Sequence, residues 1–105
     1  MYVYTHDVPI DFDTYRKIID TLGPAPLAGS LVHLCVRRPD GGLRYVEIWE
    51  SEEACAAAFD DRIHPAVGQV LAGGVPTGEH RLEHLEVLHA SGTLLDGKAS
   101  AKRAA

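Results

Sequence analysis

The sequence predicts one α+β domain in which strands and helices follow in the order βαββαβ. Three observations support this prediction: runs with the alternating hydrophobicity of strands, two stretches with helical spacing of apolar residues, and a Gly-rich turn between two strand-like runs. With 105 residues, of which 46% are hydrophobic, the chain can bury one small core and has no room for two domains.

The first half of the chain predicts a strand, a helix and a hairpin. Residues 2–6 alternate as a strand does, and a helical pattern then continues until Gly23 and Pro24. The β-rich runs 30–38 and 43–50 flank the turn PDGG, which predicts a hairpin. The apolar residues that give the helical pattern are Phe12, Tyr15, Ile19 and Leu22.

The second half predicts a helix and a last strand. Ser51 is a suitable N-cap, and acidic residues follow it at the positive end of the helix dipole. Because Pro65 lacks an N–H and disfavours the helical region at His64, we expect the helix to end or kink there. Residues 80–90 form the expected last strand. The expected buried stripe of the helix is Ala54, Cys55, Ala58, Phe59 and Ile63.

This order of elements is the split-βαβ or ferredoxin-like plan, an antiparallel four-stranded sheet with two helices on one face. We expect the domain to span residues 1–92 and a frayed, mildly basic tail to span residues 93–105. A net charge of −5 without a cluster of Lys and Arg argues against a nucleic-acid partner. No apolar run approaches the roughly 20 residues of a membrane span, and no secretion signal is recognisable, so we expect a cytoplasmic protein with two packed, reduced thiols.

Period-two alternation separates the strand residues into an aliphatic set and an aromatic, ionisable set. We expect the helices to cover the aliphatic set, which comprises Val32, Leu34, Val36, Val46 and Ile48. The opposite face would then carry tyrosines, histidines, a cysteine and the tryptophan, a composition unlike that of a solvated face. We therefore expect a second copy of the sheet to cover it, which gives a homodimer.

The segment EIWESEEA with the following FDDRIHPAV resembles the dimeric α+β barrel superfamily, in particular the small antibiotic-biosynthesis-monooxygenase-like proteins. The matching residues are Tyr45, Trp49, Glu50, Glu53, Ala54, His64 and Pro65. The resemblance implies a dimeric barrel. It also implies one of several activities: cofactor-free quinone-forming oxygenation in polyketide pathways, haem degradation, isomerisation or cyclisation. Some members have no established activity.

This sequence departs from the oxygenases of that superfamily at two places. Those enzymes often carry a histidine in mid-helix and an asparagine near the first strand. Here Ala58 or Phe59 occupies the helix position, the first strand offers Thr5 and His6, and the chain contains no asparagine. Proton-handling groups therefore have to be sought among other residues.

His33, His84 and Glu86 are the candidate catalytic residues, because an imidazole with an unperturbed pKa near neutrality suits a general base. His33 with Glu47 or Glu86 as its orienting carboxylate is the best candidate. The alternatives are a satisfied buried polar cluster or an iron site formed by His33, His84 and Glu86. His80 and His84 cannot chelate one ion, since they lie about 13 Å apart along a strand.

Several further residues are candidates for contact with a substrate. Trp49 either stacks on an aromatic substrate or packs at the dimer interface. Arg37 either balances an anionic substrate or forms a surface ion pair, and His64 either contacts substrate or caps the helix junction. The full set of candidate substrate contacts is Tyr4, Arg37, Tyr45, Glu47, Trp49 and His64.

These inferences predict an enzyme that binds a small aromatic or polyketide-like molecule between the sheet and the helices or between two sheets. The expected reaction is oxygenation of an electron-rich phenol or anthrone without metal or other cofactor. A cyclase or isomerase that uses the same histidines only to move protons is the first alternative, and a non-catalytic ligand-binding dimer is the second.

Overall fold

The computed structural model describes residues 1–72 and 80–93, so the predicted tail lies outside it apart from Thr93. The elements in chain order are β1 (Tyr2–Val8), α1 (Phe12–Leu22), β2 (Ser30–Arg37), β3 (Leu43–Trp49), α2 (Glu52–Ala58), the π-helical turn η1 (Phe59–Ile63), α3 (His64–Val70) and β4 (Arg81–Leu85). The predicted order is confirmed, although β4 is shorter than expected. No helix in the described ranges is long and apolar enough to cross a membrane.

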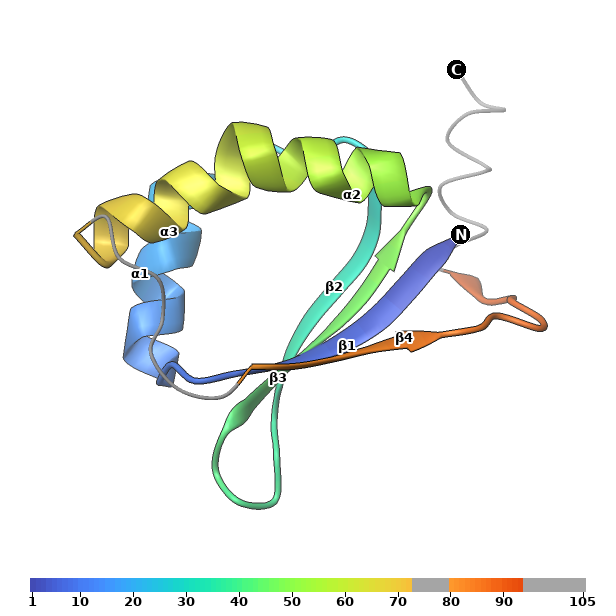
Figure 1. Ribbon diagram of the computed structural model, residues 1–105, viewed down its shortest axis with the longest axis horizontal. Helices are drawn as coiled ribbons and strands as arrows, with labels where there is room; N and C mark the ends of the chain where they lie inside the picture. Colours follow the sequence, from blue (N-terminus) through green and yellow to red (C-terminus); the bar gives the residue numbers. More distant parts are fainter. Residues whose placement is uncertain (73–79, 94–105) are drawn as a thin grey trace.

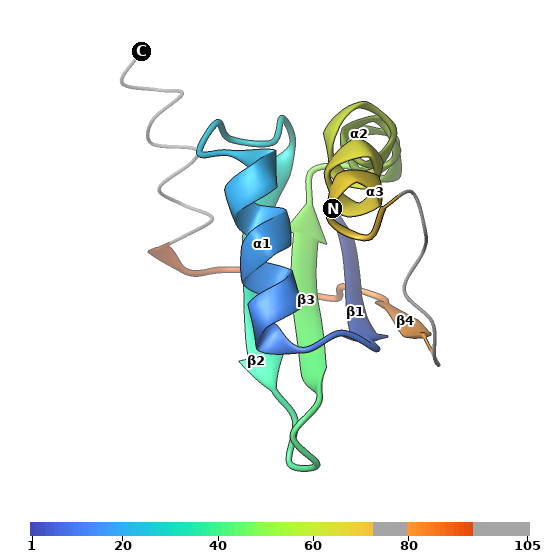
Figure 2. The same cartoon turned by 90° about the vertical axis from the view of Figure 1, so that its left-hand side faces the viewer.

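The four strands form one antiparallel sheet in the order β2-β3-β1-β4, with β1 paired to both β3 and β4. All helices lie on one side of this sheet (Figure 1). Viewed from the side, α1 passes over β2 and β3, and α3 packs against α1 (Figure 2). The arrangement is the ferredoxin-like fold that the order of elements predicts.

The core of the domain lies between α2 and the adjacent end of the sheet. Trp49, the last residue of β3, is fully buried at 0% exposure, and its ring lies 6.5 Å from that of Phe59. Partly buried neighbours, Ala54 and Ile63 among them, pack against the centre of the core, which consists of Tyr4, Trp49, Cys55 and Ala58. Trp49 is therefore buried within a single subunit, and the expectation that only a dimer would bury it is wrong.

The grouping of strand residues by face follows the prediction, but the helices cover the other face. Glu47 lies opposite Tyr4 on one side and opposite His33 on the other, so the aromatic and ionisable residues share a face. Glu47 and Tyr4 are buried beneath the helices, whereas Leu34 and Val36 on the reverse face are 48% and 38% exposed. The face that points away from the helices, here called the outer face, includes Val3, Val32, Leu34, Val36, Val46, Ile48 and Leu85.

Packing explains why the covered face is the aromatic one. Alternation determines which residues share a face, but not which face the helices approach. The helix α2 presents small side chains such as Cys55 and Ala58, which leave room for the large rings of Tyr4 and Trp49. The aliphatic outer face has no such partner among the described residues.

The helical segment after β3 changes from α2 through η1 to α3 around Pro65. Ser51 caps α2 as predicted, since its Oγ accepts a hydrogen bond from the Ala54 amide at 3.1 Å. The chain then passes through η1 into α3, and His64 keeps helical angles of φ −59° and ψ −44°. A π-helical turn shifts the hydrogen-bond ladder by one residue just before the proline, which lacks an N–H to contribute. The expected interruption therefore takes the form of a π-helical turn, after which α3 starts at His64 with Pro65 in its first turn.

The close approach of the loop before β2 to α2 explains why position 54, in the EEA segment, is occupied by a residue as small as alanine. Gly29 has φ +85°, and a Cβ built there would lie 2.5 Å from the Cβ of Ala54. The Gly29 carbonyl also accepts a hydrogen bond from the Glu50 amide at 2.8 Å. Only small residues allow this approach, so Ala54 serves the fold rather than a binding site.

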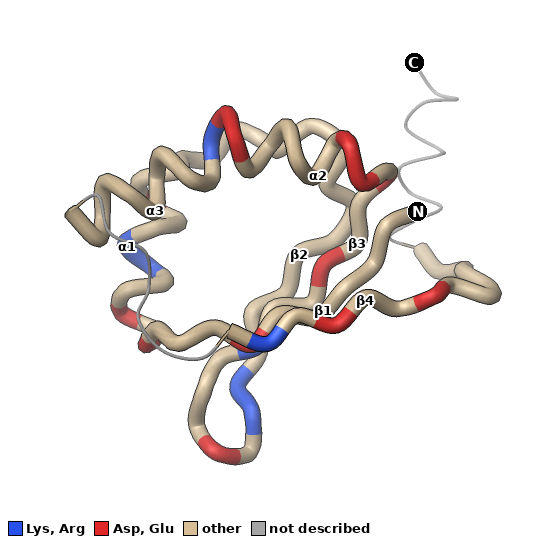
Figure 3. Tube along the Cα trace, viewed as in Figure 1, with Lys and Arg blue, Asp and Glu red and all other residues tan. Residues whose placement is uncertain are grey.

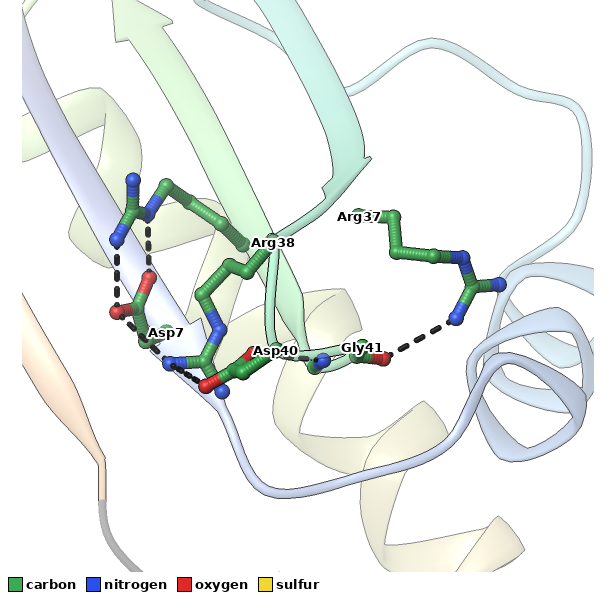
Figure 4. Close-up of polar contacts among 7 residues, drawn as sticks. Asp7, Arg37, Arg38, Asp40 and Gly41 are labelled. Atoms are coloured by element: carbon green, nitrogen blue, oxygen red, sulfur yellow. Dashed lines mark hydrogen bonds and ion pairs between the residues drawn. The ribbon is translucent and has the colours of Figure 1, made fainter.

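An ionic cluster joins the β2–β3 hairpin to β1 (Figure 4). Arg44 donates to Asp7 through Nε at 2.6 Å and Nη2 at 3.1 Å, and Arg38 lies 3.4 Å from the same carboxylate. The hydrogen bond from Arg44 is the main reason that the pKa of Asp7 lies below its ordinary value, despite the opposing effect of burial.

We expect Asp7→Asn to lower the free energy of unfolding at neutral pH by about 1 kcal/mol, because its arginine partners remain partly solvated. Since the pKa of Asp7 is lower in the folded protein than its ordinary value of 3.8, its contribution to stability is present above pH 3.8 and is lost as the pH falls through the folded-state value. Urea unfolding measured from pH 7 down to pH 2 should therefore show that the free energy of unfolding falls less steeply with decreasing pH in the variant than in the parent protein. Asp20→Asn, on the exposed side of α1, is the control. The prediction would be contradicted if the free energy of unfolding of Asp7→Asn fell with decreasing pH as steeply as that of the parent protein.

Candidate functional site

A cavity of about 350 Å³ lies between the sheet and the helices, beside the core around Trp49. This volume falls at the lower end of the range for small-molecule sites. Its wall combines aliphatic side chains from the helices and from the ends of the strands with polar side chains from the sheet. The aliphatic and phenyl lining consists of Val8, Ile10, Ile18, Ile19, Leu22, Leu27, Phe59, Ile63 and Val67. The polar lining consists of His6, Tyr15, Ser30, His33, Tyr45, Glu47, His64 and His80.

Three of the polar residues form a hydrogen-bonded line, here called the base cluster: Glu47, His33 and Tyr15. Glu47 is 4% exposed on the central strand β3, and its carboxylate pairs with Nδ1 of His33 directly opposite on β2. Nε2 of the same ring lies 2.7 Å from the Tyr15 hydroxyl, which α1 brings over the sheet. Because an ionised carboxylate can only accept, the hydrogen-bond network assigns the proton to Nδ1 and leaves Nε2 as the acceptor.

The base cluster has the geometry of a general base with an orienting carboxylate. The carboxylate fixes the ring orientation and the tautomer, and it stabilises the imidazolium that forms when Nε2 takes a proton. About one third of the His33 side chain remains accessible, at 34%, so Nε2 can exchange Tyr15 for the hydroxyl group of a ligand.

Two tyrosines enclose His33 with flat surfaces. The Tyr15 ring stacks on His33 with centroids 6.0 Å apart and planes 14° apart, and Tyr45 lies 5.3 Å from the same ring. Burial raises the pKa of Tyr15 to about 12, with Cys35 and Glu47 adding to the effect. Burial also raises the pKa of Tyr45. Both phenols therefore stay neutral at physiological pH and act as hydrogen-bond donors rather than as bases.

A second pair of polar residues lies on the far side of Tyr45. His6 on β1 packs edge-on against Tyr45 at 6.0 Å, and its Nε2 lies 3.1 Å from Nδ1 of His80. Burial, followed by the proximity of His80, lowers the pKa of His6. His6 is thus a neutral imidazole at physiological pH, and it lines the same cavity as His33.

Four of the predicted site residues meet at this cavity: His33, Tyr45, Glu47 and His64. His64 comes from α3, where its ring lies 5.4 Å from Phe59 in an edge-to-face contact. His64 also lies at the junction of η1 and α3, where its backbone N–H donates to the Phe59 carbonyl.

His84 and Glu86 lie outside the cavity, contrary to expectation. Register aligns His33, Glu47, Tyr4 and His84 in one row across all four strands, so about 14 Å separates the two histidines. The ring of His84 instead bonds the Tyr2 hydroxyl at 2.7 Å, and Glu86 is exposed beyond the end of β4. The hypothesis of an iron site formed by His33, His84 and Glu86 is therefore wrong. Within residues 1–72 and 80–93, no group of three or more suitable side chains is placed to hold a metal ion.

Three expected substrate contacts also lie elsewhere. Tyr4 and Trp49 belong to the core, where the Tyr4 hydroxyl lies 3.7 Å from Sγ of Cys55. Arg37 is at the hairpin end of β2, where it donates to the carbonyl of Gly41 at 3.1 Å (Figure 4). It does not belong to the cavity lining. The Trp49 indole is thus neither a cavity wall nor a dimer contact.

Four polar residues of the cavity were not among the predicted site residues: His6, Tyr15, Ser30 and His80. Tyr15 fitted the apolar stripe of α1, and the only available signal was a hydroxyl group in a stripe that otherwise carries none. His6 and His80 lie on strands that are neighbours only in the folded sheet, so nothing in their spacing along the chain links them.

Solved structures from other organisms have a similar fold. A protein from Nitrosomonas europaea, provisionally described as an antibiotic biosynthesis monooxygenase, aligns with a TM-score of 0.61 and 12% identity over 85% of this chain and 100% of its own. The two chains share the ferredoxin-like α+β fold described above. Rv0793 from Mycobacterium tuberculosis has this fold as well, with a TM-score of 0.59 and 18% identity over 87% of this chain and 97% of its own.

These structures share the fold of this chain without close sequence similarity. No protein-family model matches the sequence, and a search of curated proteins finds no match. At these identities the likeness defines the architecture, while the chemistry has to be argued from the base cluster and the cavity.

Proposed function

We propose that the protein is a cofactor-independent monooxygenase that binds a small aromatic molecule in the cavity, where His33 removes a proton from it. The observation that carries this proposal is the base cluster at the wall of an otherwise largely apolar cavity. The similar solved structure from N. europaea, provisionally described as an antibiotic biosynthesis monooxygenase, supports the reaction class.

The reaction begins with deprotonation of a phenol or of an anthrone CH₂ group by Nε2 of His33. Glu47 stabilises the resulting imidazolium, and the neutral hydroxyls of Tyr15 and Tyr45 can donate to the oxygen on which negative charge develops. The electron-rich anion is itself the reductant for molecular oxygen, so the step needs no metal or flavin.

The oxygen chemistry balances for an anthrone. The carbanion transfers one electron to O₂, and the two radicals combine to form a C–O bond. A proton returned by the His33 imidazolium gives a hydroperoxide. Loss of water then breaks the O–O bond and the remaining C–H bond to leave a carbonyl. The CH₂ carbon loses four electrons, one oxygen atom enters the product, and the other leaves as water.

The assembly we propose is a homodimer in which the outer faces of two sheets meet. Leu34, Val36 and Leu85 are 48%, 38% and 44% exposed in the single chain, and they lie with Val32, Val46 and Ile48 on the outer face. Exposed apolar side chains gathered on one face are typical of a surface that pairs with another chain. An isologous pairing would bury it on both subunits.

The free thiols of Cys35 and Cys55 are consistent with a cytoplasmic location.

Leu34→Glu is expected to convert the dimer to a monomer, because two-fold symmetry places an unpaired carboxylate in the interface twice. Analytical ultracentrifugation should show about half the mass of the parent protein, and circular dichroism should show the same helix and strand content. Leu88→Glu, at a position that is 89% exposed beyond β4, is the matched control and should stay dimeric. A parent protein that sediments as a monomer would rule out the proposed assembly.

Oxygen consumption with a panel of phenols, dihydroquinones and anthrones tests the proposed reaction. We expect uptake of one O₂ per substrate converted, with one labelled atom from ¹⁸O₂ in the product. Conversion without oxygen uptake would instead indicate a cyclase or isomerase. Binding without any conversion across the panel would indicate a non-catalytic ligand-binding dimer.

A further inference from the structure

We propose that Tyr15 caps the base and makes the cavity selective for ligands that carry a hydroxyl group, because only a hydroxyl can insert between Tyr15 and His33. This inference rests on the proposed function and narrows its substrate class. The group that meets Nε2 of His33 is the O–H of a phenol or an enol, and aromatic ethers and ketones are rejected. An anthrone meets this condition in its enol form.

The acceptor nitrogen of His33 already has a partner. Glu47 pairs with Nδ1, and the Tyr15 hydroxyl lies 2.7 Å from Nε2. A neutral imidazole has one acceptor nitrogen with a single lone pair in the plane of the ring, so Nε2 accepts one strong hydrogen bond at a time. A ligand therefore reaches the base only if the bond between Tyr15 and His33 opens.

A hydroxyl group can open this bond without leaving either partner unsatisfied. It donates through its hydrogen and accepts through its oxygen, so a ligand hydroxyl can donate to Nε2 while it accepts from Tyr15. Two hydrogen bonds that meet at one oxygen need about 4.5 Å between the Tyr15 oxygen and Nε2, so the present 2.7 Å has to widen by about 2 Å. An ether or ketone oxygen only accepts, and its entry would exclude water and leave Nε2 without a donor.

The Tyr15 side chain can make this shift while its backbone stays fixed. Asp11 anchors the start of α1, since its Oδ1 accepts from the Thr14 amide at 2.8 Å and its carbonyl accepts from the Tyr15 amide at 3.0 Å. The Tyr15 ring stacks on Phe12 with centroids 5.9 Å apart, and Phe12 is 43% exposed. One neighbour of the Tyr15 ring is thus a solvent-accessible side chain, so the ring can tilt without disturbing the core around Trp49.

The inserted arrangement makes the ligand the more acidic of the two hydroxyls. Burial is the main reason that the pKa of Tyr15 rises to about 12. The ligand oxygen accepts a hydrogen bond from Tyr15, which lowers the pKa of the ligand hydroxyl. The ligand O–H bond therefore breaks, and an N–H bond forms at Nε2 of His33. The electron pair stays on the ligand oxygen and delocalises into the ring, which for an enol gives the same anion as loss of a CH₂ proton.

The charges around the cavity favour entry of the neutral hydroxyl form. Among the described residues, the cavity lining contains neither Lys nor Arg, and its carboxylate, Glu47, pairs with His33. Figure 3 shows the arginines and the lysine of the described chain on the helical segments, the strands and the hairpin. A phenolate would lose its hydration on entry without gaining a Lys or Arg partner. The protonated form, which can insert, is therefore the form that enters.

Equilibrium binding under anaerobic conditions tests the cap with two probes of similar shape, 2-naphthol and 2-methoxynaphthalene. In calorimetric titrations of the full chain, the parent protein should bind the naphthol about tenfold more tightly, because only the naphthol satisfies both Nε2 and Tyr15. In Tyr15→Phe the methoxy probe has no capping bond to break, so its affinity should rise about fivefold. The naphthol loses the bond from Tyr15 but has no cap to open either, so its affinity should change by less than about twofold.

Tyr2→Phe is the matched control, because the Tyr2 hydroxyl also lies 2.7 Å from Nε2 of a histidine, His84, but neither residue lines the cavity. It removes the same kind of hydrogen bond from the same face of the sheet and should leave both affinities unchanged. Circular dichroism verifies that each variant is folded. The two probes compared on the parent protein test the proposal even if Tyr15→Phe does not fold.

Equal affinity of the parent protein for the two probes would overturn the proposal. A preference for the naphthol that is as large in Tyr15→Phe as in the parent, or that falls equally in Tyr2→Phe, would also overturn it. Failure of both probes to bind would overturn both this inference and the proposed ligand site. A preference that falls about fivefold in Tyr15→Phe, without oxygen uptake by the parent complex in air, would support the cap and would count against the proposed oxygenation alone.

Discussion

Replacing His33 by glutamine is expected to reduce kcat/KM for oxygen consumption about 10²- to 10⁴-fold, the range for loss of a general base. Glutamine can still hydrogen-bond to Glu47 and to Tyr15, so it keeps the polar contacts of the base cluster, but it cannot take a proton at neutral pH. Initial rates measured with an oxygen electrode, on protein whose unfolding midpoint matches that of the parent, give the ratio directly.

Two further variants separate catalysis from structure. His84→Gln changes the same residue type on the same sheet face, but it lies outside the cavity and should keep the parent rate. Glu47→Gln keeps the size of the side chain but removes the charge that stabilises the imidazolium, so it should give a smaller loss than His33→Gln. Full activity in His33→Gln, or an equal loss in His84→Gln, would refute the assignment of the base.

Trp49→Ala is expected to lower the free energy of unfolding by about 3 to 5 kcal/mol, the cost of removing a large aromatic side chain from a packed core. Its indole is fully buried among Tyr4, Cys55 and Phe59. A loss of this size is a large part of the stability of a small domain. Urea unfolding followed by circular dichroism measures it, and Trp49→Phe should cost less because it refills most of the space.

Fluorescence distinguishes burial within a subunit from burial at an interface. Trp49 is the only tryptophan of the chain, so its emission reports on a single site. In the monomeric Leu34→Glu protein, the emission should keep the maximum of a buried indole. A red shift on dissociation would place Trp49 at the subunit contact and contradict the packing described above.

Leu88→Ala, at a highly exposed position, is the control for the stability measurement and should change the free energy of unfolding by less than about 0.5 kcal/mol.

The elements of the fold could be predicted because their signals are local. Ser51 marks the start of α2 through its own hydroxyl, and alternation along β2 and β3 identifies which residues share a face. The covered face could not be predicted in this way, because both faces of the sheet are rich in large apolar side chains. The choice depends on how the small residues of α2 fit over the rings of Tyr4 and Trp49, which is a property of the packed structure.

In the candidate site, too, contacts set by neighbouring strands could be predicted, whereas contacts set by tertiary packing could not. His33 and Glu47 lie on two strands joined by a short turn, so their contact follows from the hairpin register. His84 was expected in the same cluster, but β3 and β1 lie between β2 and β4. Tyr15 reaches His33 from a helix, and its position depends on the packing of α1 rather than on any spacing along the chain.

The alternation along β3 also separates two kinds of evolutionary change. Tyr45 and Glu47 face the ligand cavity, whereas Val46 and Ile48 face the proposed partner subunit. Substitutions at the cavity-facing positions of β3 can therefore change the substrate range without altering the residues that support assembly. A mutant library aimed at substrate range can be restricted to those positions. Changes in length are not tolerated so freely. A register shift of one residue in β3 would carry the base cluster's carboxylate to the outer face and bring aliphatic side chains into the cavity, so both functions would be lost in one event.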